Sequence, residues 1–172
     1  MIKMKKSFLL CIIILSIVIL FGGVAMLFAA RKSYEPKIKQ GEFPFSLTYK
    51  INDEIINIKN TYVCEFDGVG WDTGRGFYRK WKGYVKESGL ENVLITEDSQ
   101  RKIFCQVGNA QYYMGDDKYL DWASKSLSPP HLYIETKSNN FDFMSVEEIK
   151  QTYGIEIISW EFSEPIKNSY IN

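Results

Sequence analysis

The positions of apolar and polar residues divide the chain into two parts. Residues 7–30, SFLLCIIILSIVILFGGVAMLFAA, form an uninterrupted apolar segment without a charged side chain. As a helix rising ~1.5 Å per residue, this segment would measure ~36 Å, enough to cross a hydrocarbon core of ~30 Å. From Phe43 onward, apolar residues alternate with polar ones, the period of a strand with one buried face. We therefore expect a helix that spans the lipid bilayer, followed by a β-rich domain.

The length of the apolar segment bears on whether it is retained. A cleavable signal peptide has an apolar region of about 7–15 residues and a small residue three positions before the cleaved bond. Cleavage after Ala29 or Ala30 would instead place Leu27 or Phe28 at that position. Residues 23–25, Gly-Val-Ala, form a weak cleavage motif, so a signal peptide stays open as the alternative. The length favours an uncleaved anchor.

Charged residues on the two sides of the apolar segment indicate its orientation. Lys3, Lys5 and Lys6 precede it, whereas Arg31 and Lys32 follow it. The balance favours a cytoplasmic N-terminus and a C-terminal domain outside the membrane. The chain has 21 basic and 21 acidic residues; without the five flanking basic residues, 16 basic and 21 acidic ones remain, a net charge of −5. Such an acidic domain argues against nucleic acid as a partner.

The rest of the chain has the organisation of one domain behind a short connection. Strand-period alternation recurs about seven times, with a two-residue turn at Asn52-Asp53 and a hairpin over 92–107. This pattern predicts a mainly β fold, an antiparallel sandwich or open barrel. We expect a cytoplasmic N-terminus at 1–6, a transmembrane helix at 7–30, a polar tether at 31–42 and an extracytoplasmic domain at 43–172.

One short helix is expected in the second half of the domain. Ser145 and Glu148 have the spacing of a capping box, and Gly154 supplies a residue suited to the left-handed end of a helix. These signals predict a helix over 146–153. A weaker helical pattern of apolar residues lies within 119–127 and is ended by Pro129-Pro130, but it is not counted as an element of the expected fold.

Candidate chemistry is sparse, and the segment DGVGWDTGRGFYRKWKG, residues 67–83, is the most conspicuous stretch. Its glycines do not have the spacing of a dinucleotide or phosphate-binding loop, and no helix follows them. They are typical of a turn and a bulge between two strands. The strand after them carries lysines framed by tyrosines, which can hold an anionic or sugar ligand by charge and stacking. The candidate binding residues are Trp71, Arg75, Tyr78, Lys80, Lys82 and Tyr84; a solvated strand edge is the alternative.

Histidine and cysteine limit the catalytic possibilities. The chain has one histidine, His131, at the expected start of a strand, so an enzyme of the Ser-His-Asp or Cys-His type would have to use it. Cys64 and Cys105 lie on apolar strand faces, where they form either a disulfide or two buried thiols. One histidine and scattered cysteines are a poor zinc site. We expect neither a metal nor a cofactor.

The segments FPFSLTYKIN, TYVCEFDGVGW, YRKWKGY, QYYMGDD and ISWEFSEPIKNS resemble a set of uncharacterised small exported proteins of low-GC Gram-positive bacteria. The resemblance covers about residues 43–169. It implies an extracytoplasmic location and no particular activity.

Together these features favour a membrane-anchored interaction domain that binds an envelope protein or an anionic wall polymer. Two alternatives stay open. One is a small envelope hydrolase that uses His131, and the other is an immunity protein that captures a toxin.

Overall fold

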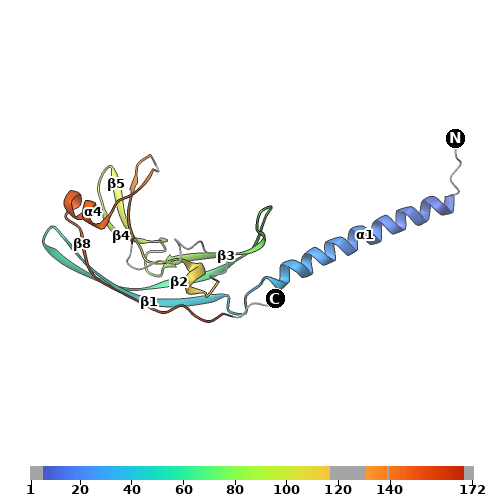
Figure 1. Ribbon diagram of the computed structural model, residues 1–172, viewed down its shortest axis with the longest axis horizontal. Helices are drawn as coiled ribbons and strands as arrows, with labels where there is room; N and C mark the ends of the chain where they lie inside the picture. Colours follow the sequence, from blue (N-terminus) through green and yellow to red (C-terminus); the bar gives the residue numbers. More distant parts are fainter. Residues whose placement is uncertain (1–5, 117–130, 139, 169–172) are drawn as a thin grey trace.

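The computed structural model describes residues 6–116, 131–138 and 140–168; the weak helical pattern within 119–127 lies outside them. It has the mainly antiparallel β fold that the alternation predicts, behind an N-terminal apolar helix (Figure 1). The elements in chain order are α1 (Lys6–Ser33), β1 (Gln40–Ile51), β2 (Glu54–Asp72), β3 (Gly76–Val85), β4 (Val93–Glu97), β5 (Arg101–Gln106), α2 (Ala110–Tyr113), β6 (His131–Thr136), β7 (Phe141–Phe143), α4 (Val146–Tyr153) and β8 (Glu156–Phe162).

The strands form two four-stranded sheets. The first has the order β3-β2-β1-β8 and the second the order β4-β5-β6-β7, and neighbouring strands are antiparallel. Asn52 and Asp53 join β1 to β2 with φ values of 51° and 66°, both left-handed. Two such residues are typical of a type I′ hairpin turn, so the predicted turn is confirmed.

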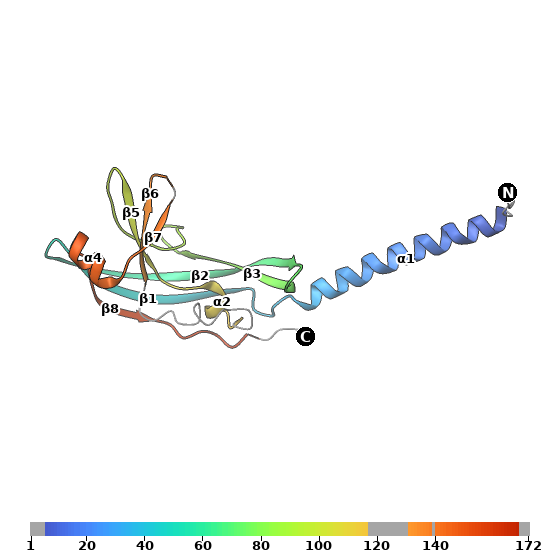
Figure 2. The same ribbon diagram turned by 45° about the horizontal axis from the view of Figure 1, so that its top comes forward.

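One core lies between the two sheets. Phe45 and Leu47 of β1 are buried there, and so are Ile103 of β5 and Leu132 of β6. Figures 1 and 2 show the second sheet standing across one end of the first, with its strands crossing those of the long sheet steeply. This end of the domain lies farthest from α1 (Figure 1).

Helix α4 confirms the prediction from the capping box. The Ser145 hydroxyl accepts a hydrogen bond from the Glu148 backbone N–H at 3.2 Å, and the Glu148 carboxylate accepts one from the Ser145 N–H at 2.8 Å. Gly154 ends the helix with φ 65°. Ile149 is fully buried and attaches α4 to the core. The strong local signals therefore give the predicted element with its predicted ends.

Helix α1 extends to Ser33, three residues beyond the expected membrane helix. Residues Cys11–Ser33 are long and apolar enough to cross a membrane, and their most apolar 18 residues have a mean hydropathy of 2.9; a signal sequence near the N-terminus has the same properties. Because β1 already begins at Gln40, the connection is limited to residues 34–39. It is shorter than the expected tether of residues 31–42.

Candidate binding surfaces

Strand β3 presents the expected row of side chains on one face. Arg79 and Val85 are buried on the inner face, whereas Lys80 and Lys82 are exposed on the other. Since side chains alternate along a strand, Tyr78 and Tyr84 share the face of the two lysines. Four of the six candidate residues therefore lie together.

The charges on this face are balanced by acidic residues of β2. The Lys80 ammonium lies 3.4 Å from a carboxylate oxygen of Asp67, and Lys82 stands opposite Glu65 in the strand register. Tyr84 donates a hydrogen bond to Glu65 at 2.9 Å, which raises the pKa of the Tyr84 hydroxyl. Two cations beside two carboxylates give no net positive field, so this arrangement does not favour an anionic polymer as the ligand.

Trp71 and Arg75 lie elsewhere, at the tip of the β2–β3 hairpin. Gly68, with φ 91°, stands at the register shift between Phe66 and Val69, and Gly76, with φ 72°, follows the turn. A glycine at a register shift is typical of a β-bulge, so the predicted bulge and turn are both confirmed. The six candidate residues thus belong to two places, the β3 face and the hairpin tip.

A buried polar cluster fixes the inner face of β3. The Arg79 guanidinium donates to the Asp116 carboxylate at 3.0 Å and to the Tyr34 backbone carbonyl at 2.8 Å, and the Trp81 indole N–H donates to the other Asp116 oxygen at 2.8 Å. The side chains of Arg79 and Asp116 are 6% and 0% exposed. Because both charges are enclosed and paired, the cluster holds the fold together and is closed to a ligand.

The two cysteines of the domain are free and buried. Burial raises the pKa of each thiol to about 12, so neither is a thiolate near neutral pH. In the structure Cys64 and Cys105 are separate thiols, not the disulfide that was one of the two expectations. A nucleophilic cysteine needs an accessible, electropositive environment, and these two buried cysteines do not have one.

His131 is exposed at the start of β6 and faces away from Cys105. Cys105 stands opposite Leu132, whereas His131 stands opposite Gln106. Since register partners share a face and neighbours alternate, His131 and Cys105 point to opposite sides of the sheet. The structure does not bring together the pair that a thiol hydrolase would use.

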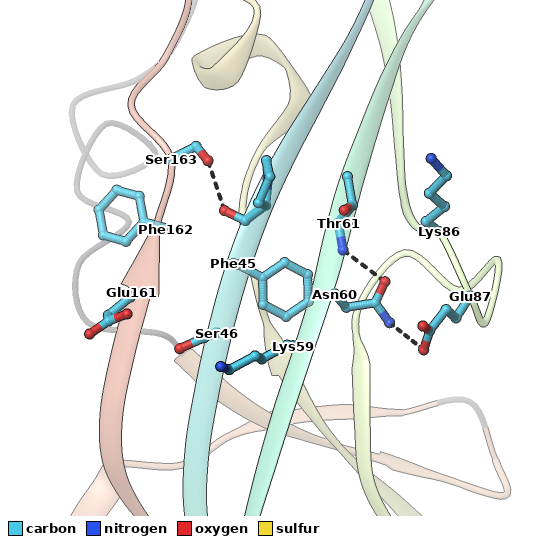
Figure 3. A pocket seen from close by; sticks show the side chains of 11 residues that line it. Phe45, Ser46, Lys59, Asn60, Thr61, Lys86, Glu87, Glu161, Phe162 and Ser163 are labelled. Carbon is cyan, nitrogen blue, oxygen red and sulfur yellow. Dashed lines mark hydrogen bonds between the residues drawn. The ribbon is translucent and has the colours of Figure 1, made fainter.

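A shallow groove of about 570 Å³ crosses β8, β1 and β2 (Figure 3). Ser46 lies on its floor and is the register partner of both Lys59 and Glu161. Figure 3 shows the Lys59 side chain directed toward Ser46. Lys59 is exposed, however, and a lysine acts as a base for a serine only when desolvation lowers its pKa. The groove therefore has the two residues of a serine-lysine pair but not the desolvated environment that would activate the lysine.

The outer face of the second sheet carries a row of aromatic rings that sequence reasoning missed. Phe104, Tyr133 and Phe143 are register partners on three adjacent strands. The Phe104 and Tyr133 rings are stacked at 5.3 Å, and Phe143 and Phe141 lie 5.8 Å and 5.9 Å from Tyr133. Phe141 and Phe143 are 59% and 71% exposed. The available signal was the alternation in Phe-Asp-Phe, residues 141–143, which is too short to predict a strand by itself.

Polar side chains flank this aromatic row on both sides. Gln106 and His131 face each other beyond one side of it, and Lys102 and Glu135 beyond the other. The Asn92 side-chain N–H donates to the Tyr133 hydroxyl at 3.0 Å and fixes that ring. Phe104 is itself buried, at 7% exposure, so the surface offers the exposed rings of Phe141 and Phe143 next to hydrogen-bonding groups.

Within the described ranges, no group of three or more histidine, cysteine, aspartate or glutamate residues could hold a metal ion. The fold and these surfaces define a two-sheet β domain behind a single N-terminal apolar helix. No known protein family, curated protein or solved structure matches the chain.

Proposed function

We propose that the protein is a single-pass membrane protein whose extracytoplasmic domain binds a glycan of the cell envelope. Helix α1 is the retained anchor, and the lysines before it keep the N-terminus in the cytoplasm. The aromatic row Phe104–Tyr133–Phe143, with Phe141 beside it, carries the proposal. Phe104 is buried and stacks on Tyr133 from within, whereas the exposed rings of Phe141 and Phe143 form the ligand surface.

The chemistry of the aromatic row suits a sugar ring. A pyranose has an apolar C–H face, which packs on an aromatic ring, and an edge of hydroxyl groups, which needs hydrogen-bond partners. Phe141 and Phe143 expose their rings, and the Gln106–His131 pair provides donors and acceptors on the same face. A surface with both features is complementary to a polysaccharide chain.

The place of the aromatic row in the fold supports the same function. The second sheet lies at the end of the domain away from α1 (Figure 1). Exposed apolar patches rimmed by polar residues are commonly interaction sites, and the sheet that carries this one lies at the end of the domain away from α1. An envelope polymer outside the membrane can reach it.

Cosedimentation of the full-length protein in detergent micelles with insoluble peptidoglycan, chitin and cellulose tests the proposal. We expect at least one polymer to sediment the wild type. Removing two exposed rings in the Phe141→Ala, Phe143→Ala variant should weaken that binding about 5- to 150-fold, from ~0.5–1.5 kcal/mol per ring contact.

Ile158→Ala is the matched control, since Ile158 is an exposed apolar residue of the other sheet, 51% accessible. Its binding should equal that of the wild type. Failure of all three polymers to sediment the wild type, or equal binding by the double variant, would refute the glycan surface.

A further inference from the structure

The tip of the β2–β3 hairpin lies beside the last turns of α1, as both views show (Figures 1 and 2). Trp71 and Phe77, which are register partners, line an apolar cavity of about 570 Å³ together with Val24, Leu27, Phe28 and Arg31 of the helix. The four helix residues occupy positions i, i+3, i+4 and i+7, so they form one face of α1. The hairpin therefore stands alongside a surface that would contact lipid.

The level of the hairpin relative to the membrane follows from the helix. The apolar segment ends before Arg31 and Lys32, which mark the water-facing boundary of a spanning helix. Val24 lies seven residues earlier, a distance of ~10 Å along the helix axis. Trp71 and Phe77 are thus held between the level of the last apolar turns and the level of the headgroups.

The side chains at the hairpin tip suit this level. The Trp71 side chain is 62% exposed, although it is a large aromatic residue, and tryptophan is enriched where a membrane meets water. Arg75 is exposed at the turn and forms no ion pair among the described residues. Its guanidinium matches the phosphate of a lipid headgroup in charge and geometry.

The contact between hairpin and helix is fixed by the connection between them. Arg79 of β3 donates to the backbone carbonyl of Tyr34, one residue after α1, and lies over the Tyr34 ring at 5.7 Å. The Tyr34 and Phe77 rings lie 5.6 Å apart. Asn168 makes two further hydrogen bonds with the Ile38 backbone, at 3.1 Å and 2.8 Å. The six residues between α1 and β1 are therefore bound to the domain, and the hairpin is held at the helix.

We infer that the β2–β3 hairpin tip, residues 71–77, is a second membrane contact that inserts into the outer lipid interface next to α1. Trp71 and Phe77 pack against lipid at the boundary of the hydrocarbon core, and Arg75 binds headgroup phosphate. This inference rests on the retained anchor of the proposed function. It assigns Trp71 and Arg75 to the bilayer and removes them from the ligand surface.

Fluorescence quenching in vesicles tests the inference. The full-length protein is reconstituted into phosphatidylcholine–phosphatidylglycerol vesicles that contain lipids brominated either near the headgroup or near the chain end. We expect wild-type tryptophan fluorescence to be quenched more strongly by the shallow bromine. Trp71→Phe should lose most of that quenching.

Trp160→Phe is the matched control because the Trp160 indole N–H is buried without a hydrogen-bond partner among the described residues. Its replacement costs no hydrogen bond, and quenching should persist. Equal quenching in Trp71→Phe and wild type, or no quenching in the wild type, would overturn the inference.

Alkaline carbonate extraction of the same vesicles tests whether α1 anchors the protein, independently of whether the hairpin tip contacts lipid. Wild type and Trp71→Phe should both stay in the membrane fraction, because α1 alone is long enough to hold them. Release of the wild type would overturn the anchor and the inference together. Retention without Trp71-dependent quenching would overturn the hairpin contact alone.

Discussion

Substituting Asp116 by Ala should strongly destabilise the domain. The change removes the acceptor of both the Arg79 guanidinium and the Trp81 indole N–H, and leaves the arginine charge buried with 6% of its side chain exposed. Removing one partner of a buried ion pair typically lowers the free energy of unfolding by ~3–5 kcal/mol. A domain of this size is stable by ~5–15 kcal/mol, so the loss is a large share of the total. We expect the melting temperature to fall by roughly 10 °C or more.

The substitution Asp116→Asn separates charge from shape. The amide has nearly the same size and keeps an oxygen that can accept one hydrogen bond, so we expect a smaller loss of ~1–3 kcal/mol. Asp67→Ala is the control, because it breaks the exposed Lys80–Asp67 pair at 3.4 Å and should cost less than ~1 kcal/mol.

Urea unfolding of the full-length protein in micelles, followed by tryptophan fluorescence, measures the free energy of unfolding of the wild type and of each of the three variants. The reasoning would be refuted if Asp116→Ala were within ~1 kcal/mol of the wild type, or if it cost no more than Asp67→Ala.

Three further predictions concern the core thiols and α4. In a Cys11→Ser background, neither Cys64 nor Cys105 should react with a thiol reagent in the native protein at pH 8. Both should react when the protein is unfolded in urea without reductant. No reaction in urea would show that the two cysteines form a disulfide. Burial raises the pKa of both thiols from about 9 to about 12, so the folded state holds the thiol protons more tightly than the unfolded state. The stability that the two thiols contribute is therefore full below pH 9 and is lost as the pH rises from 9 to 12. The free energy of unfolding should therefore be lower at pH 10 than at pH 7, by ~1 kcal/mol per thiol. The Cys64→Ala, Cys105→Ala variant should lose less, and an equal loss would contradict this origin. Ser145→Ala should lower the free energy of unfolding by ~1 kcal/mol in the same urea experiment, because the substitution removes the N-cap of α4. An unchanged urea midpoint would show that α4 does not need this cap.

Features encoded within a few residues were predictable from the sequence. The Asn52-Asp53 turn, the capping box of α4 and the bulge at Gly68 each depend on backbone preferences of one or two residues, and all three are present. The alternation along β3 also placed its four outward side chains on one face. Local chemistry decides such elements, so a single sequence is enough.

Features that join distant strands were not predictable. Arg79 and Asp116 are 37 residues apart, and nothing in either neighbourhood indicates that the two charges pair. The aromatic row requires three strands in one register, including β7, which has only three residues. The carboxylates beside Lys80 and Lys82 come from β2 in the same way. Charge and exposure at a surface depend on which strands become neighbours, and that information is not local.

The position of β1 has a mechanical consequence. Helix α1 feeds into β1 after six residues, and β1 lies between β2 and β8 in the long sheet, paired with β2 over all 12 of its residues. If the far sheet holds a fixed polymer while α1 stays in the membrane, tension enters the domain along the axis of β1. Interstrand hydrogen bonds run perpendicular to the strands, so such a pull loads them together in shear and does not unzip them one at a time. Under the proposed function, the long sheet would therefore resist a pull between bilayer and polymer best along the axis of β1.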